Sequence, residues 1–120
     1  MSRDPYSARV RALFSHPEHA GSLEGLPAAR IDEQGVCVQF SGSVADGVIV
    51  KLRFLAWGCP HLIAAAEAVC AQYEGRPLAE LETLRAEELM QSLPVPVEKT
   101  GRILVIEDAA RALGKTLGTL

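Results

Sequence analysis

The 120-residue chain lacks any apolar run long enough to form a membrane span. Spanning helices need ~18 or more consecutive apolar residues, and no stretch of the sequence approaches that length. The N-terminal sequence MSRDPYSARVR also lacks the apolar region of a signal peptide. We therefore expect a cytoplasmic protein with no membrane partner. Residues 1–120 are expected to form one domain, since domains commonly contain ~100–150 residues.

The chain has no excess of basic residues either. Lys and Arg together number 12 against 15 Asp and Glu, which gives a formal net charge of −3. A protein that tracks phosphates needs clustered positive charge, so we expect no nucleic-acid partner. The sequence also contains no G-x-S-x-G, P-loop, G-x-G-x-x-G or H-E-x-x-H motif. These absences remove the commonest hydrolase, nucleotide and metalloprotease signatures.

Cysteine is scarce, and its spacing matches no familiar framework. The three residues Cys37, Cys59 and Cys70 are an odd number, which is a poor basis for disulfide pairing and fits a reducing compartment. No C-x-x-C pair occurs, so a zinc ribbon and a thioredoxin-type redox pair are both excluded.

What the sequence does contain is a helix, then strand patterns, then several helices. Val36, Val38 and Phe40 alternate with other residues at the period of a half-buried strand, and Asp46-Gly47 is a turn signal. The order predicts an α+β fold, a small antiparallel β-sheet of about three strands with helices packed on one face. The expected strands cover residues 28–33, 36–41 and 47–57, and the expected helices cover 5–15 (Pro5 in its first turn), 59–74, 77–84, 86–93 and 103–117.

Two further features of the helical half are expected from residue type. Gly75 stands where a helix commonly ends in a glycine. The prolines of the segment LPVPVEK, residues 93–99, are expected to make it an extended connector. The longest helix should bury one stripe, consisting of Leu62, Ala66, Val69, Cys70 and Tyr73.

The junction Trp57-Gly58-Cys59-Pro60-His61 carries the strongest chemical signal in the chain. A strand ends there, and the Cys59 thiol stands at the start of a helix. Open backbone N–H groups and the helix dipole stabilise a thiolate at such a position, which makes the sulfur a nucleophile or a metal ligand. The alternative is that Cys59 is simply a small buried residue at a tight turn.

The other two cysteines are not expected to join Cys59 in one metal site. Cys70 lies eleven residues further along the helix, which corresponds to roughly 16 Å. Two thiolates that share one ion must lie within about 4 Å of each other, so Cys70 is interpreted as a core residue. Cys37 faces away from the side that carries Val36 and Phe40, and it is interpreted as structural.

The histidines give weaker signals. His16 and His19 lie in an early loop and are expected to be solvated, because they could approach a metal only if that loop folded over one. His61 lies in the first turn of the helix that follows Cys59, and its orientation is left open. A thiol enzyme based on Cys59 and His61 would need a third, orienting group, which the spacing does not identify.

Five short segments, spread over nearly the whole chain, stand in the order and spacing of one known family. They are Tyr6 to Ser22 around Val10, Phe14 and Pro17; Phe54 with Gly58-Cys59 and Ile63-Ala64; Gly75 to Leu78; Leu93 to Lys99; and Glu107-Asp108-Ala109. In this order they resemble the motifs of the IscU/NifU N-terminal family of iron–sulfur cluster assembly scaffolds. The resemblance implies that family's α+β fold.

The resemblance also implies a ligand set, which this chain does not match. Family members hold a cluster or a zinc ion with three cysteines and an aspartate, and some use a histidine. The first cysteine's place falls near 32–33, and Cys37 lies roughly 13–17 Å beyond it along an extended strand. Sliding Cys37 into that place still supplies no aspartate. The last cysteine's place holds Gly101 or Arg102, and the histidine's place holds Thr100 or Gly101, so only Cys59 matches.

These matches and departures lead to one main hypothesis and two alternatives. The resemblance implies a non-enzymatic, divergent scaffold-like protein that keeps Cys59 as its one metal or persulfide position, with an iron–sulfur cluster, iron or zinc as cargo on an incomplete ligand set. A positive charge at Arg102 favours an anion or thiolate over a metal cation there. The resemblance also implies two partners, a cysteine desulfurase and a DnaK-type chaperone. The chaperone would bind residues 93–99. The alternatives are an interaction or regulatory module that binds no cluster, and a thiol enzyme.

Overall fold

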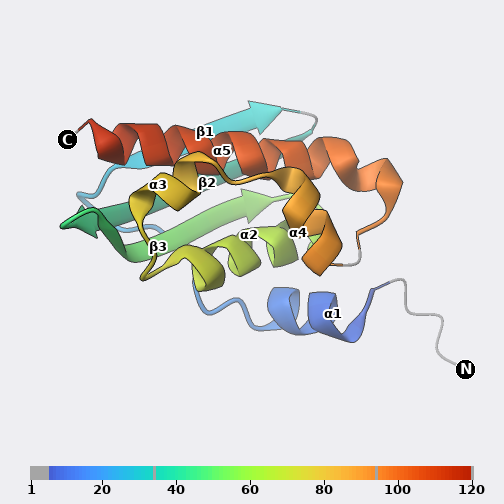
Figure 1. The fold of residues 1–120 in the computed structure, drawn as a ribbon. Helices are drawn as coiled ribbons and strands as arrows, with labels where there is room; N and C mark the ends of the chain where they lie inside the picture. Colours follow the sequence, from blue (N-terminus) through green and yellow to red (C-terminus); the bar gives the residue numbers. More distant parts are fainter. Residues whose placement is uncertain (1–5, 34, 94, 120) are drawn as a thin grey trace, which may run out of the picture.

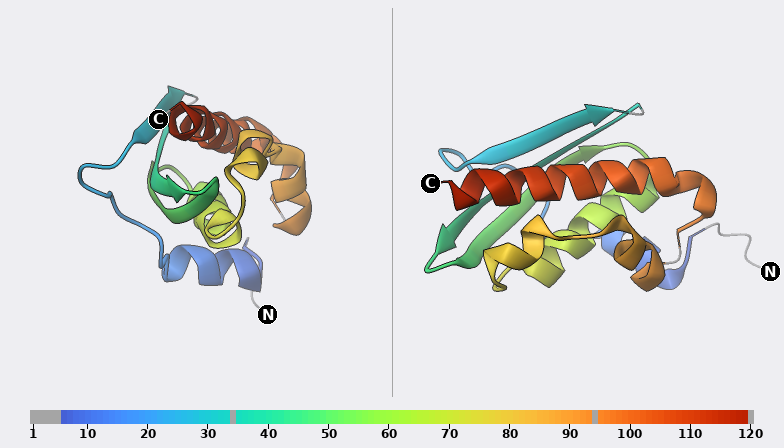
Figure 2. Two further views of the ribbon diagram at one scale, coloured as in Figure 1. Left: turned by 60° about the vertical axis from the view of Figure 1, so that its left-hand side comes forward. Right: turned by 45° about the horizontal axis from the view of Figure 1, so that its top comes forward.

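The computed structural model describes residues 6–33, 35–93 and 95–119. In these residues a three-stranded sheet forms one layer, and helices lie across one of its faces (Figures 1 and 2). None of the helices in the described part is both long and apolar enough to cross a bilayer. The elements in chain order are α1 (Ala8–Ser15), β1 (Ala28–Glu33), β2 (Val36–Ala45), β3 (Val48–Trp57), α2 (Pro60–Tyr73), α3 (Leu78–Glu82), α4 (Ala86–Ser92), the 3-10 helix η1 (Val97–Lys99) and α5 (Thr100–Gly118).

The sheet has the order β1-β2-β3, with both neighbouring pairs antiparallel. This confirms the predicted α+β class. Asp46 and Gly47 form the turn between β2 and β3, and their φ angles of 53° and 75° are those of a tight two-residue hairpin turn. Strand β2 continues beyond the expected end at Ser41 to Ala45. A Cβ on Gly42 would lie 2.5 Å from the carbonyl oxygen of Lys51, so only glycine lets β3 approach there.

The core lies between the sheet and the two long helices α2 and α5. Val38 and Phe40 on β2 and Phe54 on β3 are buried against this layer, and the whole predicted stripe of α2 is buried as well. Side chains of this size contribute ~1.5–3 kcal/mol each on full burial. Helix α5 packs over β1 and β2, whereas α2 packs against β3 and supports α1 on its other side (Figure 2).

The outer edge of β3 is covered by two loop segments. Near one end of the strand, the N–H of Phe54 donates to the carbonyl of His19 at 3.0 Å, and the N–H of Gly21 donates to the carbonyl of Phe54 at 2.7 Å. Near the other end, the N–H of Ile49 donates to the carbonyl of Arg76 at 2.9 Å. These bonds satisfy backbone groups that an exposed edge strand would leave for another chain to pair with.

Two helices begin at residues other than those expected from the sequence. Helix α1 begins at Ala8, because the hydroxyl of Ser7 accepts the N–H of Val10 at 3.1 Å and so caps the helix. Pro5, which was expected in its first turn, lies outside the described residues. Helix α5 begins at Thr100, three residues before the expected Ile103.

The connector between α4 and α5 is also not fully extended, so that prediction was wrong. Residues Val97–Lys99 form a 3-10 turn directly before α5. Pro96 has a φ of −60° and precedes the turn, so its missing N–H interrupts no bond inside it. Pro94, the other proline of this segment, lies outside the described residues.

Candidate functional site

Cys59 stands at a corner where three elements meet. Strand β3 ends at Trp57, and Cys59 is the residue that precedes the first turn of α2, as predicted. A Cβ on Gly58 would lie 2.9 Å from the Val36 side chain and 2.6 Å from the Leu62 side chain. Only a glycine therefore lets the junction lie so close to the start of β2. Figure 1 shows the first turn of α5 at the same end of the molecule.

The surroundings of Cys59 favour its thiolate. The side chain is partly buried. Burial opposes ionisation, but the backbone N–H of Leu62, the hydrogen-bonding guanidinium of Arg102, the backbone N–H of His61 and the charge of Lys99 together hold the pKa of Cys59 below its ordinary value. The predicted closeness of Arg102 to the thiol is confirmed, and the sulfur is a potential nucleophile.

Helix α5 is braced against the segment before it, which fixes the position of its first turn. The carboxylate of Glu107 accepts the N–H of Ala86 at 2.9 Å, and so caps α4, whose own N-cap residue Arg85 provides no side-chain bond. Arg111 donates from Nε to the carbonyl of Leu84 at 2.8 Å. Two side chains of α5 therefore hold the chain that leads into α4, and Arg102 extends from the same rigid helix.

The expected first-ligand place falls at the end of β1. Asp32 lies in an ion pair with Arg30 at 3.8 Å, and Glu33 is exposed. The estimate that separated Cys37 from this place along an extended strand was wrong, because the chain reverses between β1 and β2. Asp32 and Cys37 are cross-strand partners, at a spacing of ~4.5–5.5 Å between Cα atoms. Even so, no group of three or more His, Cys, Asp or Glu residues able to hold a metal occurs among the described residues.

The orientation of His61, left open by the sequence, is inward. Its side chain is 3% exposed and its ring lies 4.9 Å from the Tyr6 ring, centroid to centroid. Within the described part of the chain, neither ring nitrogen has a hydrogen-bond partner. Burial lowers the pKa of His61, and the charge of Lys99 lowers it further against the opposing effect of Glu98. His61 therefore makes no hydrogen bond to Cys59, and the pair is not assembled as a nucleophile and its base.

His19 is not a solvated loop residue, which corrects the sequence expectation, whereas His16 is exposed as expected. The backbone N–H and ring Nδ1 of His19 contact the two carboxylate oxygens of Glu67 at 2.7 and 2.5 Å. Next to them, Arg53 donates to Glu74 at 2.7 Å. A signal was available in the sequence, since Glu67 is the one Asp, Glu, Lys or Arg residue within 60–73. A lone buried carboxylate of this kind needs a partner.

Cys70 is a core residue, as predicted. It is fully buried, and burial followed by the negative charges of Glu67 and Glu74 raises the pKa of the Cys70 thiol far above its ordinary value. Cys37 is also buried, with 7% of its surface exposed. Of the three cysteines, only Cys59 therefore combines accessibility with stabilisation of the thiolate.

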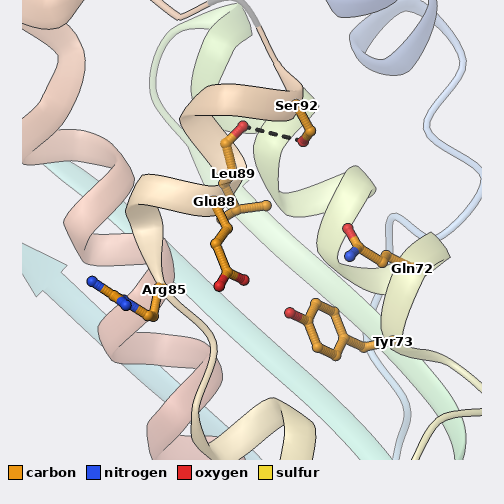
Figure 3. Close-up of a pocket in the computed structure, with 6 residues that line it drawn as sticks. All are labelled: Gln72, Tyr73, Arg85, Glu88, Leu89 and Ser92. Atoms are coloured by element: carbon orange, nitrogen blue, oxygen red, sulfur yellow. Dashed lines mark hydrogen bonds between the residues drawn. The ribbon is translucent and has the colours of Figure 1, made fainter.

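Two hollows accompany these sites. An apolar one flanks the Cys59 corner and is lined in part by Phe14, Trp57 and Ile63. A polar one lies at the opposite end of α2, against α4, where the hydroxyl of Ser92 donates to the carbonyl of Leu89 at 3.3 Å (Figure 3). The polar hollow contains no thiol or imidazole, and it is lined by Gln72, Tyr73, Arg85, Glu88, Leu89 and Ser92.

Residues 5–115 match the sequence model of a family described as the NifU-like N-terminal domain. The chain is 25% identical over 119 residues to the mitochondrial iron sulfur cluster assembly protein 1 of Eremothecium gossypii. That alignment covers 92% of this chain and 77% of the relative. It is 26% identical over 119 residues to the iron–sulfur cluster assembly scaffold protein IscU of Escherichia coli strain K12. That alignment covers 89% of both chains.

A solved structure has the same fold. The crystal structure of the N-terminal part of a NifU-like protein from Brucella abortus superposes with a TM-score of 0.76 over 94% of each chain, at 17% sequence identity. This similarity confirms the arrangement of a three-stranded antiparallel sheet with helices on one face.

Proposed function

The chain belongs to the family of NifU-like N-terminal domains, and from this premise we propose that it handles sulfur in iron–sulfur cluster assembly through Cys59. It is a divergent member of the scaffold family, at 25–26% identity to relatives named for cluster assembly. The observation that carries the proposal is the position of Cys59 at the start of α2 beside Arg102, where the thiolate is stabilised. Cys59 is the retained position of the family's metal and persulfide site.

The proposed step is the transfer of one sulfur atom from a cysteine persulfide on a partner enzyme. The Cys59 thiolate attacks the terminal sulfur of that persulfide, and a new sulfur–sulfur bond forms at Cys59. The donor's own sulfur–sulfur bond breaks, and the donor leaves as a thiolate that takes up a proton from solvent. No net oxidation occurs, because one persulfide is exchanged for another.

A complete cluster or metal ion does not fit the donors of this corner. Iron–sulfur clusters are normally held by four protein ligands, most of them thiolates. Cys59 is one thiolate, His61 is turned toward Tyr6, and Asp32 is paired with Arg30. Iron, zinc or a cluster would therefore be cargo held at Cys59 only with ligands from another chain, and no step of the proposal depends on them.

The partners proposed for this function are a cysteine desulfurase as sulfur donor and a DnaK-type chaperone. The connector before α5 supports the second partner, because Val97 is 82% exposed at its centre. Val97 and the exposed Leu104 line one apolar hollow beside α4, and an exposed apolar patch of this kind fits a segment that another protein binds. We further propose that the protein acts in the cytoplasm as a carrier rather than as an enzyme.

The test is sulfur loading followed by mass spectrometry of the intact protein. The wild-type chain is treated with inorganic polysulfide, and separately with a cysteine desulfurase and cysteine, under anaerobic conditions. We expect one added sulfur atom on the wild type and on the control variant Cys37→Ser, and none on Cys59→Ser. Wild-type protein that takes up no sulfur at Cys59 from either donor would contradict the proposal.

A second measurement separates the proposal from its alternatives. Anaerobic reconstitution with iron and sulfide is followed by visible absorbance and elemental analysis. We expect the protein to remain nearly colourless while still accepting sulfur at Cys59. Strong absorbance that Cys59→Ser abolishes would instead assign Cys59 to cluster binding. If the wild type takes up no sulfur and Cys59→Ser captures the same partner proteins as the wild type, the chain is an interaction or regulatory module that binds no cluster.

A further inference from the structure

We propose that the polar groove between the end of α2 and the helices α3 and α4 is a docking site for one arginine side chain of a partner protein. The groove consists of two adjoining hollows that share Gln72, Tyr73 and Glu88. It lies at the opposite end of α2 from Cys59, so the inference goes beyond the proposed sulfur transfer and does not depend on it.

The hydroxyl end of Tyr73 forms the floor of the groove. The residue is only 7% exposed, and its hydroxyl points into the groove toward the carboxylate of Glu88 (Figure 3). A tyrosine whose ring is buried usually has a hydrogen-bond partner for its hydroxyl. Within the described part of the chain, the Tyr73 hydroxyl makes no hydrogen bond. It is therefore free to bond a group that enters the groove.

Two carboxylates line the same groove without a counter-charge. They belong to Glu80 on α3 and Glu88 on α4, and neither makes an ion pair or a side-chain hydrogen bond among the described residues. Burial raises the pKa of the Tyr73 hydroxyl, Glu88 and Glu80 raise it further, and Arg76 opposes them. The groove therefore favours a cation, whose N–H donors make strong hydrogen bonds to carboxylates.

The two arginines that line the groove are engaged with other groups. Arg85 donates to the carboxylate of Glu87 at 3.1 Å, and its guanidinium points away from Tyr73 in Figure 3. The guanidinium of Arg76 lies over the Tyr73 ring, 5.9 Å from the ring centroid. Neither arginine forms an ion pair with a carboxylate of the groove. An anionic occupant would therefore meet two uncompensated negative charges, whereas a cation would be attracted by both.

The size of the groove fits a side chain better than a complete ligand. Its wider hollow has a volume of about 230 Å³, below the ~300–1,000 Å³ of pockets that enclose a whole small molecule. A guanidinium is planar, stays charged and presents five N–H donors, so one group can bond two carboxylates and a hydroxyl. An ammonium presents three donors from a single point. Arginine is therefore the occupant that best matches these acceptors.

The experiment titrates the full, isotope-labelled chain with single amino acids and follows its backbone amides by NMR. The probes are N-acetyl-arginine amide, its uncharged isostere N-acetyl-citrulline amide, and N-acetyl-glutamate amide. The variants are Glu88→Gln, Glu80→Gln and Tyr73→Phe, which keeps the ring and removes the hydroxyl. Glu24→Gln is the matched control, because it removes the same charge from an exposed position in the loop before β1. Thermal unfolding verifies that each variant is folded.

We expect saturable shifts within residues 72–92 with the arginine probe and none with the citrulline or glutamate probe. Affinity for the arginine probe should fall about tenfold in Glu88→Gln and about threefold in Glu80→Gln and Tyr73→Phe, and stay unchanged in Glu24→Gln.

Three results would each overturn the inference. They are the absence of saturable shifts with the arginine probe, an equal or stronger response to either other probe, and wild-type affinity in folded Glu88→Gln. The titration involves no sulfur donor, so these results leave the proposed role of Cys59 untouched. Conversely, a chain that accepts no sulfur at Cys59 would leave the arginine titration to decide the role of the groove.

Discussion

The two ends of helix α2 present the same kinds of side chain in opposite states. At its start, Cys59 is partly exposed and its pKa is lowered despite its burial, by backbone N–H groups and Arg102. Further along the same helix, Cys70 is fully buried and its pKa is raised by burial and by neighbouring carboxylates. The difference shows that position on the helix, and not the thiol itself, decides which cysteine is chemically available.

The histidines repeat this contrast. Beside the second half of α2, His19 is bonded through both its backbone and its ring to Glu67, so that region is a satisfied polar network. In the first turn of α2, the His61 ring is buried and its two nitrogens have no hydrogen-bond partner among the described residues. Satisfied polar groups hold a fold together, whereas unsatisfied ones carry a cost that a function commonly explains.

The largest expected effect separates the two thiols kinetically. We expect iodoacetamide to modify Cys59 at least ~1,000 times faster than Cys70 at neutral pH, because only Cys59 is accessible as a thiolate and Cys70 reacts only after local opening. Peptide mapping by mass spectrometry at timed intervals measures both rates on one sample. Comparable rates for the two cysteines would remove the contrast between the ends of the helix.

The polar network at the second half of α2 should be important for stability. We expect Glu67→Ala to lower the free energy of unfolding by about 3 kcal/mol, because it leaves the partly buried His19 without the carboxylate that contacts its backbone N–H and ring Nδ1. Urea unfolding followed by circular dichroism measures the change. Glu18→Ala is the control, since Glu18 is exposed on the same loop. Equal effects of the two substitutions would show that the network is not structural.

The junction before Cys59 depends on a close approach, which a single methyl group tests. We expect Gly58→Ala to lower the free energy of unfolding by about 2 kcal/mol, because the new Cβ would collide with the buried Val36 and Leu62 side chains. It should also change the alkylation rate of Cys59. Gly118→Ala is a milder control, since its Cβ would approach the flexible end of Glu82 at 2.9 Å and meet Leu78 only at an ordinary contact distance of 3.9 Å. A neutral Gly58→Ala variant would mean that the corner tolerates movement.

The smallest effect concerns the buried histidine. The pKa of His61 is below its ordinary value of about 6.5, so the unfolded chain binds more protons than the folded one below that pH. Stability therefore falls as the pH drops from about 6.5. We expect His61→Leu to raise the free energy of unfolding by about 1 kcal/mol at pH 7 and to flatten this pH dependence. Urea titrations at pH 7 and 5.5 measure both, with His16→Leu, at an exposed position, as the control.

Local patterns predicted the fold well. Strand β1 covers Ala28–Glu33 as expected, the turn falls at Asp46-Gly47, and the expected stripe of α2 is buried. These features depend on period-2 alternation, turn residues and helical spacing, which are properties of neighbouring residues. The 3-10 turn at Val97–Lys99 was missed because the whole segment was predicted to be extended from its prolines. A proline restricts its own backbone and that of the residue before it, and the residues after it remain free to turn.

The candidate site was predictable only in part. The position of Cys59 and the closeness of Arg102 followed from the strand-to-helix junction and from family spacing, and both were confirmed. The partner of His19 and the pairing of Asp32 with Cys37 were missed, because both depend on how distant or reversing segments come together. Spacing along a chain gives an upper limit on distance, not the distance itself.

The packing of the last helix over the first two strands has a consequence for how the protein is made. During synthesis, β1, β2 and Cys59 leave the ribosome before α5, which covers the inner side of both strands. Until then the nascent chain exposes Val38 and Phe40, and its reactive sulfur lacks the guanidinium of Arg102. The core is therefore completed in the same final step in which the Cys59 thiol gains its neighbouring cation. A prematurely terminated chain would be prone to aggregate, and its Cys59 would lack that cation.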